Sequence, residues 1–166
     1  DFGRILTLRL DRFRGGRSGK VGIPDSILLK EGPLTEEEFE SLKKHTTLGG
    51  EAIRSAMKFF TANNFLQYAY EISVFHHEKW DGSGYPYGLK GADIPLSARI
   101  MSLADVYDAL VSKRPYKKAL PHEVAFDFIT KGIDERTLPT HFDPAILEAF
   151  EEEHLQFKEI KKIYSD

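Results

Sequence analysis

The feature that most constrains the fold is a helical spacing of apolar residues along the middle of the chain. Pro95 opens a stretch that runs to about Ser112 and keeps its apolar side chains on one helical face. These side chains are Ile100, Leu103, Ala104, Tyr107, Leu110 and Val111. Pro121 opens a second such stretch, and a third begins near Pro144 and extends to about Tyr164. The pattern predicts an all-α fold whose helices are joined by connections rather than by strands.

The first half of the chain carries helix signals of the same kind. Thr35 followed by Glu38 is a capping-box pattern, which predicts a helix over residues 36–45 that ends in Lys43, Lys44 and His45. Gly49-Gly50 then loosens a second helix, and Asn63-Asn64 supply a cap for a third that ends at Phe75. Three helices are therefore expected before the central part of the chain.

The two ends of the chain read differently. Leu6, Leu8 and Leu10 alternate as in a strand, but arginines crowd the same stretch and Gly15-Gly16 breaks it, so we expect a frayed terminus. The other end is rich in Glu and Lys, which is typical of a solvated helix face.

Composition excludes several classes of protein. The 166 residues fit one domain, and 41% hydrophobic residues indicate a globular chain. A net charge of −3 argues against DNA or RNA binding, and the absence of cysteine excludes disulfides and thiolate ligands. No window resembles a membrane span or a signal peptide, so a cytoplasmic location is expected.

Two adjacent histidines, His76 and His77, stand at the end of an apolar run, with a glycine-rich loop over residues 79–93 behind them. Neutral histidine is the commonest biological metal ligand, and glycines let backbone approach a bound molecule closely. The alternative is a surface loop that happens to hold two histidines. The loop is long and irregular for a simple connector.

Asp105 and Asp108 lie three residues apart in the central stretch, and Asp105 sits beside its apolar stripe. An aspartate near a core must be paired, hydrogen-bonded or bound to metal; it could equally cap a neighbouring helix. His45 alone could simply favour a helix dipole. Together His45, His76, His77 and Asp105 form a nitrogen and oxygen donor set that suits iron, manganese or zinc.

Basic residues follow the same stretch, with Arg114, Lys117 and Lys118 around Pro115-Tyr116. Arginine and lysine can hold phosphate oxygens. The alternative is an ordinary basic helix end, which would show the same residues. Lys20 has the same two interpretations.

Several segments together resemble the HD-GYP family. They are residues 76–91, Leu103-Ala104-Asp105-Val106-Tyr107-Asp108-Ala109-Leu110, Arg114-Pro115-Tyr116-Lys117 and Thr140-His141-Phe142-Asp143-Pro144. The resemblance implies an HD-domain helical bundle with a long GYP loop and a two- or three-metal centre. It also implies hydrolysis of cyclic di-GMP in bacterial signalling. It divides the chain into an unmatched segment 1–19, an HD-GYP-like domain 20–150 and a C-terminal helical extension 151–166.

The resemblance assigns roles to particular residues. It implies that His45, His76, His77 and Asp105 bind metal and that Lys20 polarises the scissile phosphate. Gly84-Tyr85-Pro86 matches the loop that contacts the nucleotide, and Arg114 and Lys117 match residues that bind its phosphates. The divalent metal is expected to be iron or manganese. Diguanylate cyclase domains, an N-terminal sensor or receiver domain and a second copy are the partners expected besides cyclic di-GMP.

One departure bears on activity. Gly16 and Arg17 occupy the places of the family's His-Asp pair, whose aspartate bridges two metals and so helps to activate water. The sequence therefore predicts a degenerate phosphodiesterase that holds fewer ions than the family norm, or none. The alternatives are a catalytically silent module that binds cyclic di-GMP or a protein, and a remnant that only folds and dimerises.

Overall fold

The computed structural model describes residues 23–28, 30, 32–59, 64–113 and 118–163 of the chain. Lys20, Arg114 and Lys117 lie outside the described residues, as do Gly16 and Arg17. The described part is helical, with a single isolated bridge between Asp134 and Thr137, so the all-α prediction is confirmed. No helix in this part is both long and apolar enough to cross a membrane. The chain forms two compact units, Asp1–His76 and His77–Asp166.

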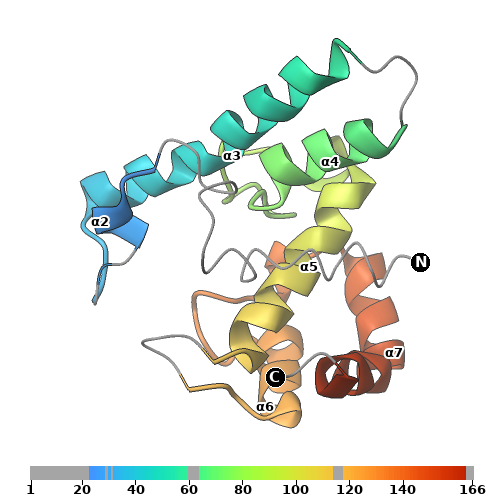
Figure 1. Ribbon diagram of the computed structural model, residues 1–166. Coiled ribbons are helices and arrows are strands. Elements are labelled where there is room, and N and C mark those ends of the chain that lie inside the picture. The colour runs from blue at the N-terminus through green and yellow to red at the C-terminus, as the bar shows by residue number, and fades with distance from the viewer. Residues whose placement is uncertain (1–22, 29, 31, 60–63, 114–117, 164–166) are drawn as a thin grey trace. The chain divides into compact units, whose positions relative to one another are not determined.

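The first unit contains α2 (Asp25–Leu28), α3 (Glu36–Met57) and α4 (Asn64–Phe75), and α3 packs against α4 (Figure 1). The predicted capping box starts α3. The backbone N–H of Glu38 donates to Thr35 Oγ1 at 3.2 Å, and that of Thr35 donates to Glu38 Oε2 at 2.7 Å. These two bonds satisfy N–H groups that a helix start otherwise leaves unpaired.

The predicted helix end at His45 is wrong, because α3 continues through Gly49-Gly50 to Met57 without interruption. His45 therefore lies in the middle of a long helix and not at its end. The glycines serve close packing. A Cβ on Gly50 would lie 2.4 Å from Val74 Cγ2 of α4, and one on Gly49 would lie 2.5 Å from Ser73 Oγ. The two helices approach closely because these positions have no side chain.

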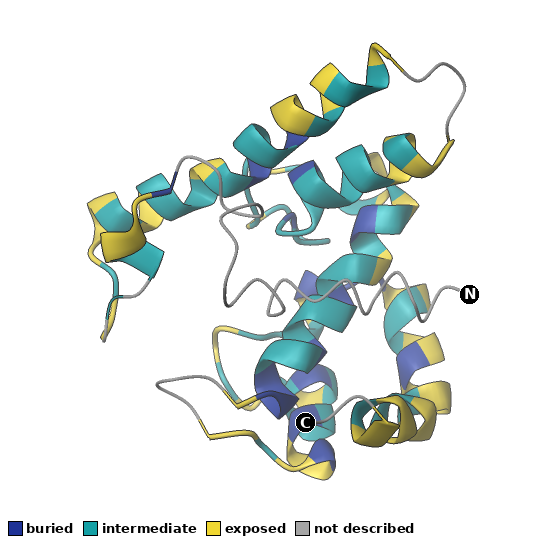
Figure 2. Cartoon of the chain, in the orientation of Figure 1, coloured by how far each residue is buried: buried dark blue, intermediate teal, exposed yellow. Residues whose placement is uncertain are grey.

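The second unit is built from α5 (Leu96–Val111), α6 (His122–Lys131) and α7 (Pro144–Ile163), with short 3₁₀ turns η2 (Gly91–Asp93) and η3 (Pro139–His141). Pro95 and Pro121 are the N-caps of α5 and α6, as their sequence positions predict. The buried core of this unit comes from all three helices and Phe142, and Figure 2 shows the buried stripe along α5. Its members are Leu103, Tyr107, Leu110, Val111, Ala125, Ile129, Phe142 and Phe150.

Helix α7 runs from Pro144 to Ile163, close to the predicted bounds, and so spans the position of the domain boundary that the resemblance implies at residue 150. Phe157, two turns beyond Phe150, packs against the core, and its ring meets that of Phe150 at 90° with centroids 5.1 Å apart. Lys161 Nζ donates to Ser112 Oγ at 2.7 Å, at the C-terminal end of α5. The C-terminal part of α7 therefore contains residues that pack on the second unit, in addition to the predicted solvated face.

Candidate metal centre

Two of the predicted ligands come from neighbouring helices of the first unit. His45 lies midway along α3 and His76 follows the last residue of α4, and their half-buried rings meet edge to face with centroids 5.6 Å apart. His77 is the next residue in the chain. One ligand atom from each of His45, His76 and His77 lies within 4.8 Å of the other two. Three imidazole nitrogens at this spacing can surround one ion.

The hydrogen bonds of two rings fix which nitrogen can bind metal. His45 Nδ1 lies 2.6 Å from the carbonyl oxygen of Leu42, and His76 Nδ1 lies 2.7 Å from that of Ile72. A carbonyl oxygen only accepts, so each Nδ1 carries the proton and each Nε2 carries the lone pair. Metal-binding histidines commonly donate their second ring N–H in this way, which sets the ring orientation. These residues therefore fit a divalent metal.

Glu78, directly after the histidines, organises the glycine-rich loop. Its side chain is only 2% exposed, and its two oxygens accept the backbone N–H groups of Tyr87 (2.7 Å) and Leu89 (3.0 Å). Gly84 lies against the backbone of the same residue: a Cβ there would be 2.5 Å from Glu78 Cα and 2.3 Å from Lys79 N. Only glycine fits at this position of the loop.

Tyr85 of the loop contacts one predicted ligand, His77, and responds to the charge of another, Asp105, within the second unit. Its backbone N–H donates to the carbonyl oxygen of His77 at 3.1 Å, and its ring stacks on that of His77 with centroids 4.7 Å apart. The bond from Tyr85 to Pro86 is cis. Burial raises the pKa of the Tyr85 phenol, and the negative charge of Asp105 on α5 raises it further. Both effects favour the protonated phenol, which is a hydrogen-bond donor.

The predicted site residues are thus distributed as follows. His45, His76 and His77 are brought together, and Gly84, Tyr85 and Pro86 form the turn of the loop beside His77. Asp105 is not a member of the histidine group, and its negative charge acts on Tyr85 of the loop. Sequence reasoning gave no role to Glu78, although an acid directly after paired histidines was visible.

The HD domain family matches residues 16–146, well over half of the chain. The chain belongs to the HD domain family. The resemblance recognised in the sequence is confirmed at this level, together with the helical fold that it implies.

Several curated relatives of this HD-domain chain carry the same kind of name. A "Probable cyclic di-GMP phosphodiesterase" of Vibrio cholerae is 50% identical over 89% of this chain and 33% of its own length. A "Cyclic di-GMP phosphodiesterase" of Thermotoga maritima is 48% identical over 80% of this chain and 33% of its own length. A "3'3'-cGAMP-specific phosphodiesterase 2" of Vibrio cholerae is 41% identical over 89% of this chain and 26% of its own length. The chain thus spans about a third or less of the relatives it matches.

Proposed function

We propose that this HD-domain chain carries a metal-dependent phosphodiesterase site for cyclic di-GMP. The observation that supports the proposal most directly is the group of His45, His76 and His77, together with the ring of Tyr85 that stacks on His77. It combines three nitrogen ligands with a loop whose backbone is held in one conformation by Glu78. The names of the relatives support the same reaction class and the same substrate.

Under this proposal each group has a separate task. A divalent metal, iron or manganese by family resemblance, would supply Lewis acidity toward a phosphodiester and its attacking water. His45, His76 and His77 would hold the metal, with Asp105 as the oxygen ligand. Gly84-Tyr85-Pro86 would contact the nucleotide through its backbone and ring.

The phosphate groups of the substrate would be bound by basic residues that lie outside the described part of the chain. Arg114 would hold phosphate oxygens as a planar fork and Lys117 as a point charge, while Lys20 would polarise the scissile phosphate. Replacement Arg114→Ala should weaken cyclic di-GMP binding, with a smaller loss at high salt because the contact is electrostatic. Isothermal titration at two salt concentrations measures this, and equal affinity before and after the change removes Arg114 from the site.

The test of the proposal combines metal content with turnover. Protein purified without oxygen or chelator is analysed for iron and manganese and is then assayed for hydrolysis of cyclic di-GMP. The replacement of His76 and His77 by alanine should remove the metal and the turnover while circular dichroism stays helical. His154→Gln is the matched control, because this histidine lies on α7 in contact with Phe126 and His122.

The possible outcomes separate the interpretations. Metal and turnover in the natural chain, both lost in the double variant, support the proposal. Metal bound without turnover contradicts it and favours a binding module, as the replacement of the His-Asp pair by Gly16 and Arg17 would predict. Unchanged metal content in the double variant removes the histidines from the site.

Substrate preference needs a direct comparison, because one relative is named for 3'3'-cGAMP. Parallel assays with cyclic di-GMP and 3'3'-cGAMP give the ratio of kcat/KM for the two dinucleotides. We expect kcat/KM for cyclic di-GMP to exceed kcat/KM for 3'3'-cGAMP. The opposite order would make 3'3'-cGAMP the proposed substrate.

A further inference from the structure

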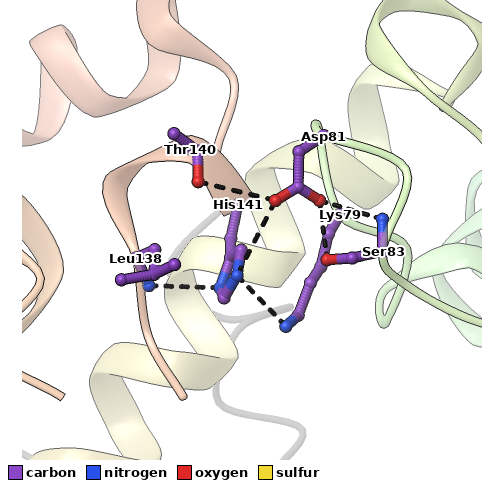
Figure 3. A network of polar contacts seen from close by, with 6 residues as sticks. All are labelled: Lys79, Asp81, Ser83, Leu138, Thr140 and His141. Carbon is purple, nitrogen blue, oxygen red and sulfur yellow. Dashed lines mark hydrogen bonds and ion pairs between the residues drawn. The ribbon is translucent and has the colours of Figure 1, made fainter. Parts of the chain in front are cut away.

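A second polar network lies in the same unit as the loop and has no place in the proposed chemistry (Figure 3). It joins Lys79, Asp81 and Ser83 of the loop to Thr140 and His141 of η3, about 60 residues later in the chain. We call these five residues the loop clasp. Here a short 3₁₀ turn with no predicted function meets the loop that carries Gly84-Tyr85-Pro86.

Asp81 is the centre of the loop clasp, because its two oxygens face different partners. Oδ1 accepts the backbone N–H of Ser83 at 2.9 Å and its hydroxyl at 2.7 Å. Oδ2 accepts the hydroxyl of Thr140 at 3.5 Å and lies 3.8 Å from His141 Nε2. One carboxylate thus fixes the turn of the loop and ties that turn to η3.

The orientation of His141 places two nitrogen donors beside this carboxylate. His141 is 8% exposed, and its Nδ1 accepts the backbone N–H of Leu138 at 3.2 Å, so the proton of the neutral ring sits on Nε2. Lys79 Nζ lies 3.3 Å from the same Nε2. Two nitrogen donors that meet in a part-buried place are unfavourable on their own. The negative charge of Asp81, whose Oδ2 lies 3.8 Å from His141 Nε2, attracts both groups and offsets this cost.

The backbone adds a second connection between the same segments. The N–H of Trp80 donates to the carbonyl oxygen of His141 at 2.8 Å, and the carbonyl oxygen of Trp80 accepts the N–H of Gly91 at 2.9 Å. Arg99, which is paired with the buried Asp143 at 2.5 Å, lies over the Trp80 ring at 5.6 Å. Both ends of the glycine-rich loop are therefore fastened around Trp80.

We infer that Asp81 and His141 are positioning residues, which hold the glycine-rich loop in the conformation that receives the nucleotide. The inference rests on the proposed function for the identity of the ligand. It assigns the segment around η3 a role in substrate positioning, through the loop and without contact to the substrate.

The first readout is independent of catalysis. Trp80 is the only tryptophan of the chain and lies between Lys79 and Asp81 of the loop clasp, so its fluorescence reports on this part of the loop. Asp81→Asn keeps an acceptor for Ser83 but puts an amide where Oδ2 must accept. We expect acrylamide to quench Trp80 more strongly in this variant, with unchanged metal content. The matched control is Asp134→Asn, because Asp134 Oδ1 also accepts a backbone N–H two residues later, that of Arg136 at 2.9 Å, in an exposed turn.

A pair of histidine variants keeps the test decisive if Asp81→Asn does not fold. His141→Asn retains an acceptor near Nδ1 and loses Nε2, whereas His141→Gln retains a donor near Nε2. Stronger quenching in the first and near-natural quenching in the second support the loop clasp. Natural quenching in both Asp81→Asn and His141→Asn overturns it.

Kinetics then connects the loop clasp with function. A displaced loop should lower kcat for cyclic di-GMP by about 10- to 100-fold at constant metal content. If the natural chain shows no turnover while the variants still change Trp80 quenching, the proposed function fails and the loop clasp stands. If the natural chain is active and the variants change neither quenching nor kcat, the loop clasp fails alone.

Discussion

Glu78 shows how one buried side chain can determine a loop. Its two oxygens each accept a backbone N–H, from Tyr87 and from Leu89, at a place with almost no access to water. A buried carboxylate is tolerated only where its lone pairs are used, and here both oxygens are used by the loop it precedes. The conformation of the loop therefore depends on a residue outside the Gly-Tyr-Pro motif.

Glu78→Gln tests this dependence with almost no change in shape. The amide nitrogen of the new side chain must face one of the two N–H donors, so one backbone group loses its acceptor. We expect stability to fall by about 1–3 kcal/mol and turnover to fall with it, while the histidines still bind metal. Urea unfolding and elemental analysis measure the two effects, and natural stability would show that the carboxylate is dispensable.

Gly84→Ala acts on the same loop through space. The added Cβ would lie within 2.6 Å of backbone atoms of Glu78 and Lys79, and backbone cannot rotate away as a side chain can. We expect turnover of cyclic di-GMP to fall by at least about 10-fold. Gly88→Ala is the control in the same loop: it strains a left-handed backbone (φ 67°) but meets no atom closer than 3.5 Å. Equal effects of the two changes would contradict the steric argument.

At the scale of an element, α3 and α4 are held close by a glycine contact. Gly50 is buried against Val74 Cγ2, which a Cβ would approach to 2.4 Å. The sequence pattern could not show this, because a glycine pair reads as a helix break until its partner helix is known. The closeness matters for the candidate site, since His45 and His76 come from the segments that this contact brings together.

Gly50→Ala should therefore destabilise the protein by about 1–3 kcal/mol through overpacking. In a Val74→Ala background the clash is removed, and the same change should become neutral or stabilising, because alanine favours a helix by about 1 kcal/mol over glycine. A double-mutant cycle by urea unfolding measures the coupling. Additive effects would mean that the two positions do not touch.

At the scale of the whole chain, a polar series crosses the core of the second unit. The hydroxyl of Tyr107 on α5 lies 2.8 Å from His122 Nδ1 on α6, and His122 Nε2 lies 2.9 Å from His154 Nδ1 on α7. Burial lowers the pKa of His122, and the proximity of His154 lowers it further, with Glu123 opposing and Lys158 adding to the decrease. The folded protein thus favours the neutral ring.

The pH dependence follows from this direction. Because the pKa of His122 is lower in the folded state than its ordinary 6.5, the unfolded chain binds the proton more readily. Stability is fully present above pH 6.5 or so and is lost as the pH falls toward the folded pKa. We expect the unfolding midpoint to drop between pH 7.5 and 5.5, and to drop less in His122→Gln. Parallel slopes in the two proteins would assign the loss to other groups, among them His141, whose pKa burial also lowers.

Local signals made part of this structure predictable. Thr35 with Glu38, Pro95 and Pro121 mark helix starts by chemistry that acts within one turn, and all three starts are observed. The paired histidines and the Gly-Tyr-Pro motif were visible for the same reason.

Pairings between residues far apart in the chain were not predictable. His141 lies near Asp81, 60 positions earlier, and His122 contacts His154, 32 positions later. The sequence around each of these residues gives no indication of its partner. The roles of Gly49 and Gly50 likewise depend on a helix that comes later in the chain. The metal assignment of Asp105 and the phosphate roles of Arg114, Lys117 and Lys20 stay predictions.

The contact of Lys161 with Ser112 has a practical consequence for anyone who expresses this domain. Ser112 caps the end of α5, directly before the basic segment 114–117, and Lys161 holds it from the far end of α7. A chain cut after Phe150 would lose both this contact and the packing of Phe157. A fragment that ends near residue 150 would therefore lack the residues that hold the C-terminal end of α5, and an expressed fragment should extend at least to Ile163.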